Sequence, residues 1–107
     1  MSAETTQAVL DHHLAALLVS DVDGLMYDYA RDSMFISNLG GVLNGFAAIR
    51  SMFAAGADMS GWELVMAHVE DEVAFITWKV DGVVSGTDTF VIRDGKIILQ
   101  TAYIAFA

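Results

Sequence analysis

The run "WELVMAHVEDEVAFITWKVDGVVSGTDTFVIRDGKIILQTAYIAFA", residues 62–107, decides the fold. It is rich in β-branched and aromatic residues, and much of it alternates between apolar and polar positions, which is typical of β-strands. Turn-forming pairs at Asp81-Gly82 and Asp94-Gly95, with the acidic stretch at 70–72, divide the run into hairpins. The run therefore predicts a meander of four strands, at residues 62–69, 73–80, 83–93 and 96–107.

The residues before this run mostly follow the spacing of helices. Val9, Leu10, His13, Leu14 and Leu17 share one apolar helical face. The predicted elements are a helix capped by Thr5 or Thr6, a short helix capped by Ser20 or Asp21 that runs through 25–30, a strand at 33–39, a short extended piece between the turns at 40–41 and 44–45, and a helix at 46–57.

Helices followed by a run of hairpins predict an α+β fold, in which the helices pack on one face of a mostly antiparallel sheet. A length of 107 residues fits a single domain, residues 1–107. The segments "VAFITW" and "YIAFA" are apolar at nearly every position, so the second face of the sheet is also expected to be buried. In so short a chain, this pattern favours a homodimer through that open face.

Composition excludes several kinds of protein. The net charge of -9, with only five Lys and Arg, argues against nucleic acid and against an anionic membrane surface. The chain has no cysteine, hence no disulfide, thiolate nucleophile or cysteine metal site. The histidines and acids do not form a metal-ligand set, and no cofactor is expected. The acidic start "MSAETTQAV" is unlike a leader peptide, so a cytoplasmic location is expected.

Three polar residues stand at positions where a packed core is expected. Asp88 lies within a strand, in alternation with Phe90, although aspartate is depleted in strands. His13 lies on the apolar face of the first helix, and an imidazole can act there as acid, base or polar anchor. His68 is in register with Trp62 and Met66 if its strand is regular, although a slip of one residue would turn it outward.

The element order, with "YARDSMFI" at 29–36, "GFAAIRSMF" at 45–53 and "FVIRDGKIILQTAYI" at 90–104, resembles the SnoaL-like and ketosteroid-isomerase-like branch of the nuclear transport factor 2-like superfamily. The resemblance covers almost the whole chain. It implies a cone-shaped, cystatin-like fold, in which a curved sheet wraps around the N-terminal helices and encloses one pocket. Members of the superfamily include isomerases, dehydratases, polyketide cyclases and proteins without catalytic activity, so the fold alone does not give the function.

The steroid isomerases of this superfamily use a carboxylate base, a tyrosine and a protonated aspartic acid. When this sequence is compared with theirs through "YA-x-D" at 29–32 and the final "AY" at 102–103, Asp88 matches the position of the protonated aspartic acid. His13 matches the position of the tyrosine. Ser37 takes the place of the base, and this departure argues against the steroid-isomerase mechanism, because a serine without an adjacent base cannot abstract a carbon-bound proton. Tyr103 matches the aromatic end of the last strand in those enzymes.

Two interpretations of these residues remain open. In the functional one, His13, Asp88 and His68 converge as acid and base in an apolar pocket, as in isomerases, dehydratases or cyclases that act on a small carbonyl- or hydroxyl-bearing molecule. In the structural interpretation, Asp88 accepts hydrogen bonds from Thr87, Thr89 or a neighbouring strand, or it pairs with Lys79 or Arg93. His13 is then a core histidine. The protein binds a ligand without catalysis or serves as a dimeric accessory domain. The residues expected to contact the ligand are Tyr103, Ser37, Trp62, Met66, Phe53 and Phe35.

Overall fold

The computed structural model describes residues 2–56, 61–81 and 83–106. The predicted order of helices and strands is confirmed, and the short extended piece is a strand, β2. The elements are α1 (Ala3–Leu18), α2 (Val22–Tyr27), β1 (Tyr29–Ser37), β2 (Gly41–Asn44), α3 (Phe46–Ala54), β3 (Glu63–Glu70), β4 (Val73–Lys79), β5 (Val83–Arg93) and β6 (Lys96–Phe106). Gly82 of the predicted Asp81-Gly82 turn and residue 57 of the predicted third helix lie outside the described residues.

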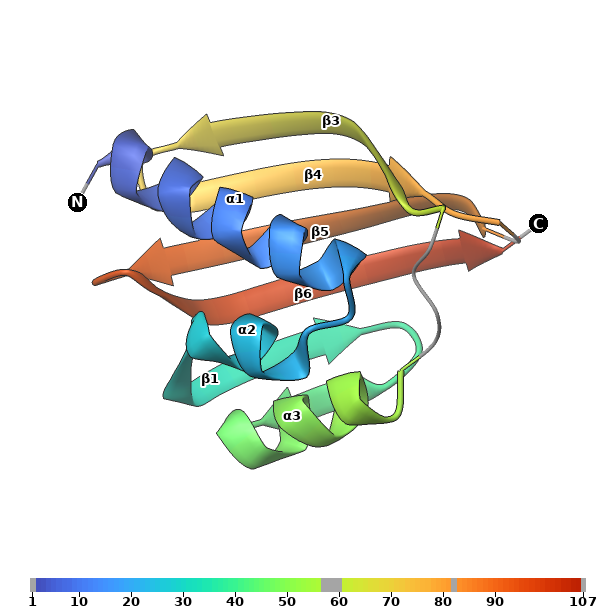
Figure 1. Ribbon diagram of the computed structural model, residues 1–107, viewed down its shortest axis with the longest axis horizontal. Coiled ribbons are helices and arrows are strands. Elements are labelled where there is room, and N and C mark those ends of the chain that lie inside the picture. Colours follow the sequence, from blue (N-terminus) through green and yellow to red (C-terminus); the bar gives the residue numbers. More distant parts are fainter. Residues whose placement is uncertain (1, 57–60, 82, 107) are drawn as a thin grey trace.

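The strands form one sheet in the order β2-β1-β6-β5-β4-β3 (Figure 1). Strands β3 to β6 form the expected antiparallel meander. Strand β1 pairs antiparallel with β2 and parallel with β6, so the last strand of the chain lies beside the first one. The sheet is therefore mostly antiparallel, as predicted.

All three helices lie on one face of this sheet (Figure 1). Helix α1 contacts β3, β4 and β5, while α3 contacts β1 and β2, and α2 lies against both of these helices. No helix among the residues that the structure describes is long and apolar enough to cross a membrane. The helices thus divide one face of the sheet between them.

The helix ends follow the expected capping chemistry with one shift. Asp21 caps α2 by accepting a hydrogen bond from the Gly24 amide at 3.0 Å, as predicted. Helix α1 begins earlier than expected, because the Ser2 hydroxyl accepts from the Thr5 amide at 3.2 Å. The predicted cap residue Thr6 is buried instead, and its hydroxyl donates to the backbone carbonyl of Asp71 at 2.5 Å. This bond ties α1 to the turn between β3 and β4.

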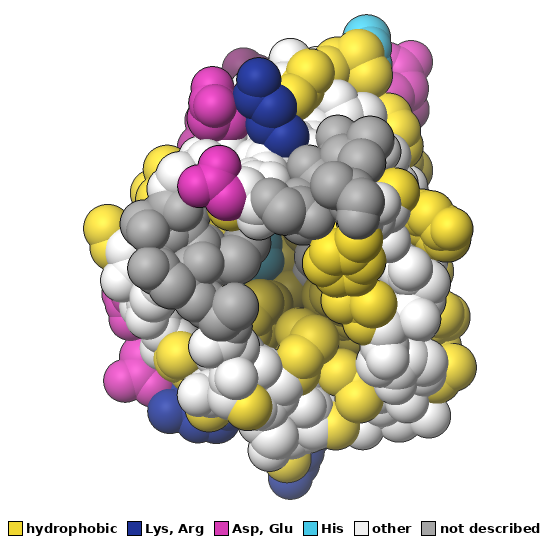
Figure 2. Space-filling view, turned by 90° about the vertical axis from the view of Figure 1, so that its right-hand side faces the viewer, with side chains coloured by type: hydrophobic (Ala, Val, Ile, Leu, Met, Phe, Trp, Pro, Cys, Tyr) yellow, Lys and Arg dark blue, Asp and Glu magenta, His cyan; other side chains and the backbone are white. Residues whose placement is uncertain are grey.

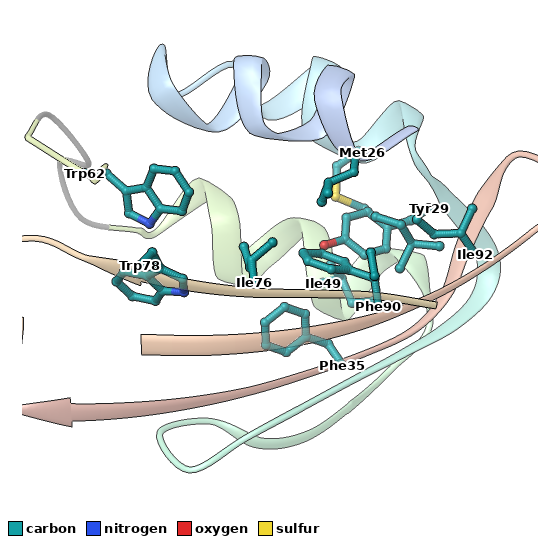
Figure 3. Packing of buried hydrophobic residues seen from close by; sticks show 12 residues of the cluster. Met26, Tyr29, Phe35, Ile49, Trp62, Ile76, Trp78, Phe90 and Ile92 are labelled. Atoms are coloured by element: carbon teal, nitrogen blue, oxygen red, sulfur yellow. The ribbon is translucent and has the colours of Figure 1, made fainter. Parts of the chain in front are cut away.

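The core lies between the helices and the inner face of the sheet (Figure 3). The inward alternation of the meander is regular in β4 and β5, where Ala74, Ile76 and Trp78 pair with Phe90, Asp88 and Gly86. The side chains of Trp62 and Trp78 are at one end of the cluster, with ring centroids 5.8 Å apart, and Met26, Tyr29 and Ile92 are at the other. Burial of each large apolar side chain contributes roughly 1.5–3 kcal/mol to the stability of the folded state.

Candidate functional site

A cavity of about 730 Å³ lies between the helices and the inner face of the sheet. Figure 2 shows its opening, with hydrophobic walls and a histidine side chain at its depth. The walls are largely apolar and aromatic, and the polar side chains in them are few. The lining residues include His13, Leu14, Phe35, Ser37, Phe53, Trp62, Ile76, Trp78, Asp88, Phe90 and Gln100. A pocket of this size and composition suits a small, largely apolar molecule.

His13 projects from α1 into this cavity and is only 3% exposed. Its Nδ1 lies 3.0 Å from Oδ2 of Asp28, and its Nε2 lies 3.3 Å from the hydroxyl oxygen of Tyr29. The edges and faces of its ring pack against the rings of Tyr29, Phe53 and Phe90 at centroid distances of 5.3, 6.3 and 5.9 Å. Both ring nitrogens and the ring plane are therefore fixed, which is what an acid or base in a cavity wall requires.

Asp28 stands at the junction of α2 and β1 and is 3% exposed. Besides His13, it contacts the half-exposed His12, whose Nδ1 lies 2.9 and 2.8 Å from its two oxygens. Its backbone carbonyl accepts from the Ile97 amide at 2.7 Å, so the same residue joins β6 to the pair of histidines on α1. An acceptor at Nδ1 of His13 fixes a proton on that nitrogen and leaves the chemistry to Nε2.

Asp88 lies on the inner face of β5 and is 8% exposed. Its Oδ1 accepts from Nε1 of Trp78 at 2.7 Å, and its Oδ2 accepts from Nε2 of Gln100 at 2.7 Å. Burial raises the pKa of this carboxyl above its ordinary value, and the hydrogen bonds from Trp78 and Gln100 and the nearby His13 oppose that rise. The donors come from neighbouring strands, as one of the structural alternatives for Asp88 anticipated.

Gly86 makes the bond from Trp78 possible. A Cβ on Gly86 would lie 2.3 Å from Cε2 of the Trp78 indole, so the ring occupies the space that any other side chain would need. The indole lies directly against the backbone of β5, two residues from Asp88, and its N–H reaches the carboxylate from there. Asp88 is thus held by a bulky donor that has no freedom to turn away.

Tyr29 and Gln100 connect the two titratable groups. The Tyr29 hydroxyl donates to Oε1 of Gln100, and Gln100 in turn donates to Asp88. Burial, and then the negative charges of Asp88 and Asp28, raise the pKa of Tyr29 well above its ordinary value, so its side chain stays a hydroxyl. A continuous buried chain of hydrogen bonds therefore runs from Asp28 through His13, Tyr29 and Gln100 to Asp88.

Four more of the predicted site residues line the cavity, namely Phe35, Ser37, Phe53 and Trp62. The Ser37 hydroxyl accepts from the Gly40 amide at 3.0 Å, which forms the turn after β1. The described lining contains no Lys or Arg, so an anionic ligand would find no cationic side chain there. Within the described ranges, no group of three or more His, Cys, Asp or Glu side chains could hold a metal ion.

Three predicted site residues are not part of the lining, contrary to expectation. In β3, Leu64 pairs with Trp78 but Met66 pairs with Thr77, so a β-bulge adds one residue to the strand. The bulge moves Met66 and His68 to the outer face of the sheet, where both are exposed. Tyr103 is 61% exposed, because its neighbours Ala102 and Ile104 hold the inward positions of β6. His68 therefore does not converge with His13 and Asp88.

Four residues of the site were not predicted from the sequence: Asp28, Tyr29, Trp78 and Gln100. Gln100 carried a usable signal, because it is a polar residue at an inward alternate position of an apolar strand, as Asp88 is. Asp28 carried none, since it lies within the short helix that the sequence predicts through 25–30. Only the observed end of α2 at Tyr27 brings its carboxylate to the histidines of α1.

The fold is shared with solved proteins of low sequence identity. An NTF-2 like protein of unknown function from Burkholderia xenovorans superimposes with a TM-score of 0.85 at 18% identity, over 100% of this chain and 88% of that one. A candidate ketosteroid isomerase from Kribbella flavida gives 0.80 at 15% identity, over 97% and 80% of the two chains. A candidate polyketide cyclase from Sinorhizobium meliloti gives 0.77 at 22% identity, over 89% and 93%.

These likenesses establish the cone-shaped, nuclear transport factor 2-like fold that the sequence predicted. No curated protein matches the chain in sequence at a significant level. The family model described as a SnoaL-like domain matches residues 10–100, which is most of the chain and includes His13, Asp88 and the chain of hydrogen bonds between them. This protein therefore belongs to the SnoaL-like domain family.

Proposed function

We propose that this protein is an enzyme of the isomerase, dehydratase or cyclase kind, which acts on a small apolar molecule that carries a carbonyl or hydroxyl group. The observation that carries the proposal is that two buried titratable groups, His13 and Asp88, stand in the wall of one cavity of about 730 Å³. Titratable groups buried in an apolar cavity are the usual means by which enzymes obtain an acid and a base near neutral pH.

The geometry assigns complementary parts to these two groups. The Asp88 carboxylate accepts one hydrogen bond on each oxygen, and each oxygen has a second lone pair with which to meet a substrate hydrogen. His13 lines the same cavity, with Asp28 at its Nδ1 to stabilise a positive charge and the Tyr29 hydroxyl at its Nε2. Elimination of water needs such a pair, in which one group takes a proton from carbon and the other gives a proton to the leaving hydroxyl.

The lining also limits the substrate class. A carboxylate at Asp88, with no Lys or Arg among the described lining residues, disfavours acids, phosphates and other anions. The aromatic rings of Phe35, Phe53, Trp62 and Phe90 offer flat apolar surfaces instead. We therefore expect a neutral substrate, such as a cyclic or aromatic hydroxy-ketone.

The test is a screen of neutral ketones and hydroxy-ketones for turnover. Loss of activity is expected in His13→Gln and in Asp88→Asn, by about 100-fold or more, which is the usual contribution of an acid or base. His68→Gln and Asp32→Asn are the matched controls, because both residues are exposed and neither lines the cavity. Turnover that survives in both site variants would contradict the proposed roles.

A non-catalytic binding protein is the second candidate function, and one observation favours it. Ser37, at the position of the isomerase base, is engaged in the turn at Gly40, and both Asp88 oxygens already accept protein hydrogen bonds. A thermal-shift titration with the same compounds separates the two functions. Ligands that raise the melting temperature without being converted would favour binding over catalysis.

We also infer a homodimer through the outer face of the sheet. Met66, Thr77, Thr87 and Tyr103 form one row across that face by strand pairing, and both Met66 and Tyr103 are exposed. Sedimentation or light scattering should give twice the mass of 11.5 kDa, and Tyr103→Lys should shift the equilibrium to monomer. A wild-type monomer at high concentration would contradict the inference. The cytoplasmic location expected from the sequence stays a prediction, which cell fractionation tests.

A further inference from the structure

The direction of each hydrogen bond in the buried chain can be assigned from the chemistry of its members. The Trp78 N–H and the Gln100 NH₂ only donate, so Asp88 accepts from both. The Gln100 carbonyl oxygen then accepts from the Tyr29 hydroxyl, which has a single hydrogen to give. The oxygen of Tyr29 is left to accept from His13, whose Nε2 lies 3.3 Å away. In this forward arrangement, His13 carries protons on both nitrogens and Asp88 is a carboxylate.

A second arrangement satisfies the same contacts. If the Gln100 amide turns by half a turn, its oxygen accepts from a protonated Asp88 and its NH₂ donates to the oxygen of Tyr29. The Tyr29 hydroxyl then donates to Nε2 of His13, which must be without a proton. This reversed arrangement holds the same number of protons and the same net charge as the forward one. The difference is one proton, which has moved from His13 to Asp88.

The two remaining protonation states break the chain. If His13 Nε2 and the Asp88 oxygen that faces Gln100 both carry a proton along the chain, two hydrogens oppose each other somewhere between them. If neither group carries a proton, two lone pairs face each other somewhere along the chain. Each defect is buried, because Tyr29, His13 and Gln100 are 3%, 3% and 4% exposed, and no buried polar side-chain atom in the described part of the chain lacks a partner. A buried polar group without a partner is strongly disfavoured.

We infer that Tyr29 and Gln100 form a reversible hydrogen-bond chain that makes the protonation of His13 Nε2 and of the Asp88 oxygen that faces Gln100 mutually exclusive. Tyr29 is not among the residues that line the cavity, whereas His13, Gln100 and Asp88 are, so part of this chain runs behind the wall. Tyr29 and Gln100 are positioning residues in this scheme. They couple the two groups, because a proton on the Asp88 oxygen that faces Gln100 requires a His13 Nε2 without a proton.

This property suits an elimination, and here the inference rests on the proposed function. From the forward arrangement, Asp88 takes a proton from the substrate carbon, and the electron pair of that C–H bond becomes the second bond of the alkene. The C–O bond breaks with its electrons on oxygen, and the departing hydroxyl replaces Tyr29 as the acceptor of the His13 Nε2–H, takes that proton and leaves as water. The site then holds its protons as the reversed arrangement does, and it adopts that arrangement when the Gln100 amide and the Tyr29 hydroxyl turn and the Asp88 proton lies toward Gln100. A water molecule in the cavity can carry the proton from Asp88 back to His13, which restores the forward arrangement.

Several charged or titratable groups surround the two ends of the chain. His13 faces Asp28 at the start of β1, Tyr29 of β1 and Asp88 of β5, with His12 beside it on α1. On the side of β4 and β6, Asp88 meets Trp78 and Gln100, which do not titrate at ordinary pH. A change at Asp88 therefore reaches His13 in two ways, through the chain and through the loss of a charge, and the test has to separate them.

The test is the protonation of His13, followed by imidazole ¹⁵N chemical shifts across a pH titration of the ligand-free protein. Asp88→Asn imposes the reversed arrangement, because its amide NH₂ can donate to the turned Gln100 while its oxygen accepts from Trp78. We expect the protonation equilibrium of His13 to shift about tenfold or more toward the neutral form. The exposed His68, in the same spectrum, is the internal control and should not change.

Two backgrounds isolate the contribution of the chain. Tyr29→Phe and Gln100→Leu each interrupt it but leave the loss of the Asp88 charge in place. In both, we expect Asp88→Asn to shift His13 by less than half of its effect in the wild-type background, on a logarithmic scale. An equal shift in all three backgrounds would show that charge alone couples the groups and would overturn the inference, as would no shift in the wild-type background. Because no substrate is used, failure of the chain and failure of the proposed enzyme activity are distinguishable.

Discussion

Replacement of Gly86 by alanine tests the contact that holds Asp88 in place. The new Cβ would lie 2.3, 2.4 and 2.7 Å from three ring atoms of Trp78, whereas carbon atoms pack favourably at about 3.5–4.0 Å. The indole must therefore retreat by roughly 1 Å or more. Its Nε1 moves with it, and the hydrogen bond to Asp88, now 2.7 Å long, is lost.

The expected cost has two parts. Overpacking of a well-filled core costs about 1–3 kcal/mol, and loss of a hydrogen bond to a buried carboxylate costs about 1.5–3 kcal/mol. Greater rigidity of alanine in the unfolded chain offsets roughly 0.5 kcal/mol. We therefore expect Gly86→Ala to lower the free energy of unfolding by about 3 kcal/mol.

Urea unfolding followed by far-UV circular dichroism measures this loss without relying on tryptophan fluorescence, which the substitution also changes. Gly40→Ala is the matched control, because its Cβ would meet only the Ser37 hydroxyl at 3.6 Å, and it should stay within about 0.5 kcal/mol of wild type. In a Trp78→Leu background the cost of Gly86→Ala should fall sharply. A stable Gly86→Ala protein, with the indole N–H resonance of Trp78 unchanged, would refute the reasoning.

Three further perturbations test other parts of the structure. Because folding raises the pKa of Asp88, the contribution of this carboxyl to stability is fully present below its unfolded pKa of about 3.9 and is lost as the pH rises through the folded pKa. The Asp88→Asn variant should therefore gain stability relative to wild type as the pH rises from 4 toward 7. A stability difference that stays constant with pH in paired melting curves would contradict this. Ser33→Ala removes a fully buried hydroxyl that accepts from the Ala30 amide at 2.8 Å and donates to the Ile97 carbonyl. Urea unfolding should show that the free energy of unfolding falls by about 1–3 kcal/mol. A fall of less than about 0.5 kcal/mol would mean that water replaces the hydroxyl. Phe53→Ala enlarges the cavity beside His13 and should allow bulkier ketones to bind in a thermal-shift assay. The same substitution should lower the free energy of unfolding by about 3 kcal/mol. An unchanged range of ligands would place the binding site elsewhere.

Much of the fold was predictable because its periodicities are strong. The alternation in β4 and β5 indicates which of their residues point inward, and it singles out Asp88 from the sequence alone. The apolar face of α1 singled out His13 in the same way. In both cases a regular element carried the information, so that one polar residue among apolar neighbours was sufficient to mark the site.

The rest of the site depends on irregular features that period counting does not detect. The bulge in β3 changes the face of Met66 and His68 without any Gly or Pro in the strand to mark it. Asp28 reaches His13 only because α2 ends at Tyr27, and helix ends are poorly specified by sequence. Tyr103 was assigned by resemblance, whereas the pairing of Asp88 with Ala102 places it on the opposite face.

The position of Asp28 has a consequence for substrate selection. Its backbone is fastened to β6 and its side chain to α1, and α1 forms one wall of the cavity. A ligand that is too thick for the cavity must displace α1, and this displacement moves the imidazole of His13 away from Asp28. If the protein has the proposed enzyme activity, such compounds would bind without being converted, and selection by size would be measured as a lower kcat rather than as weaker binding.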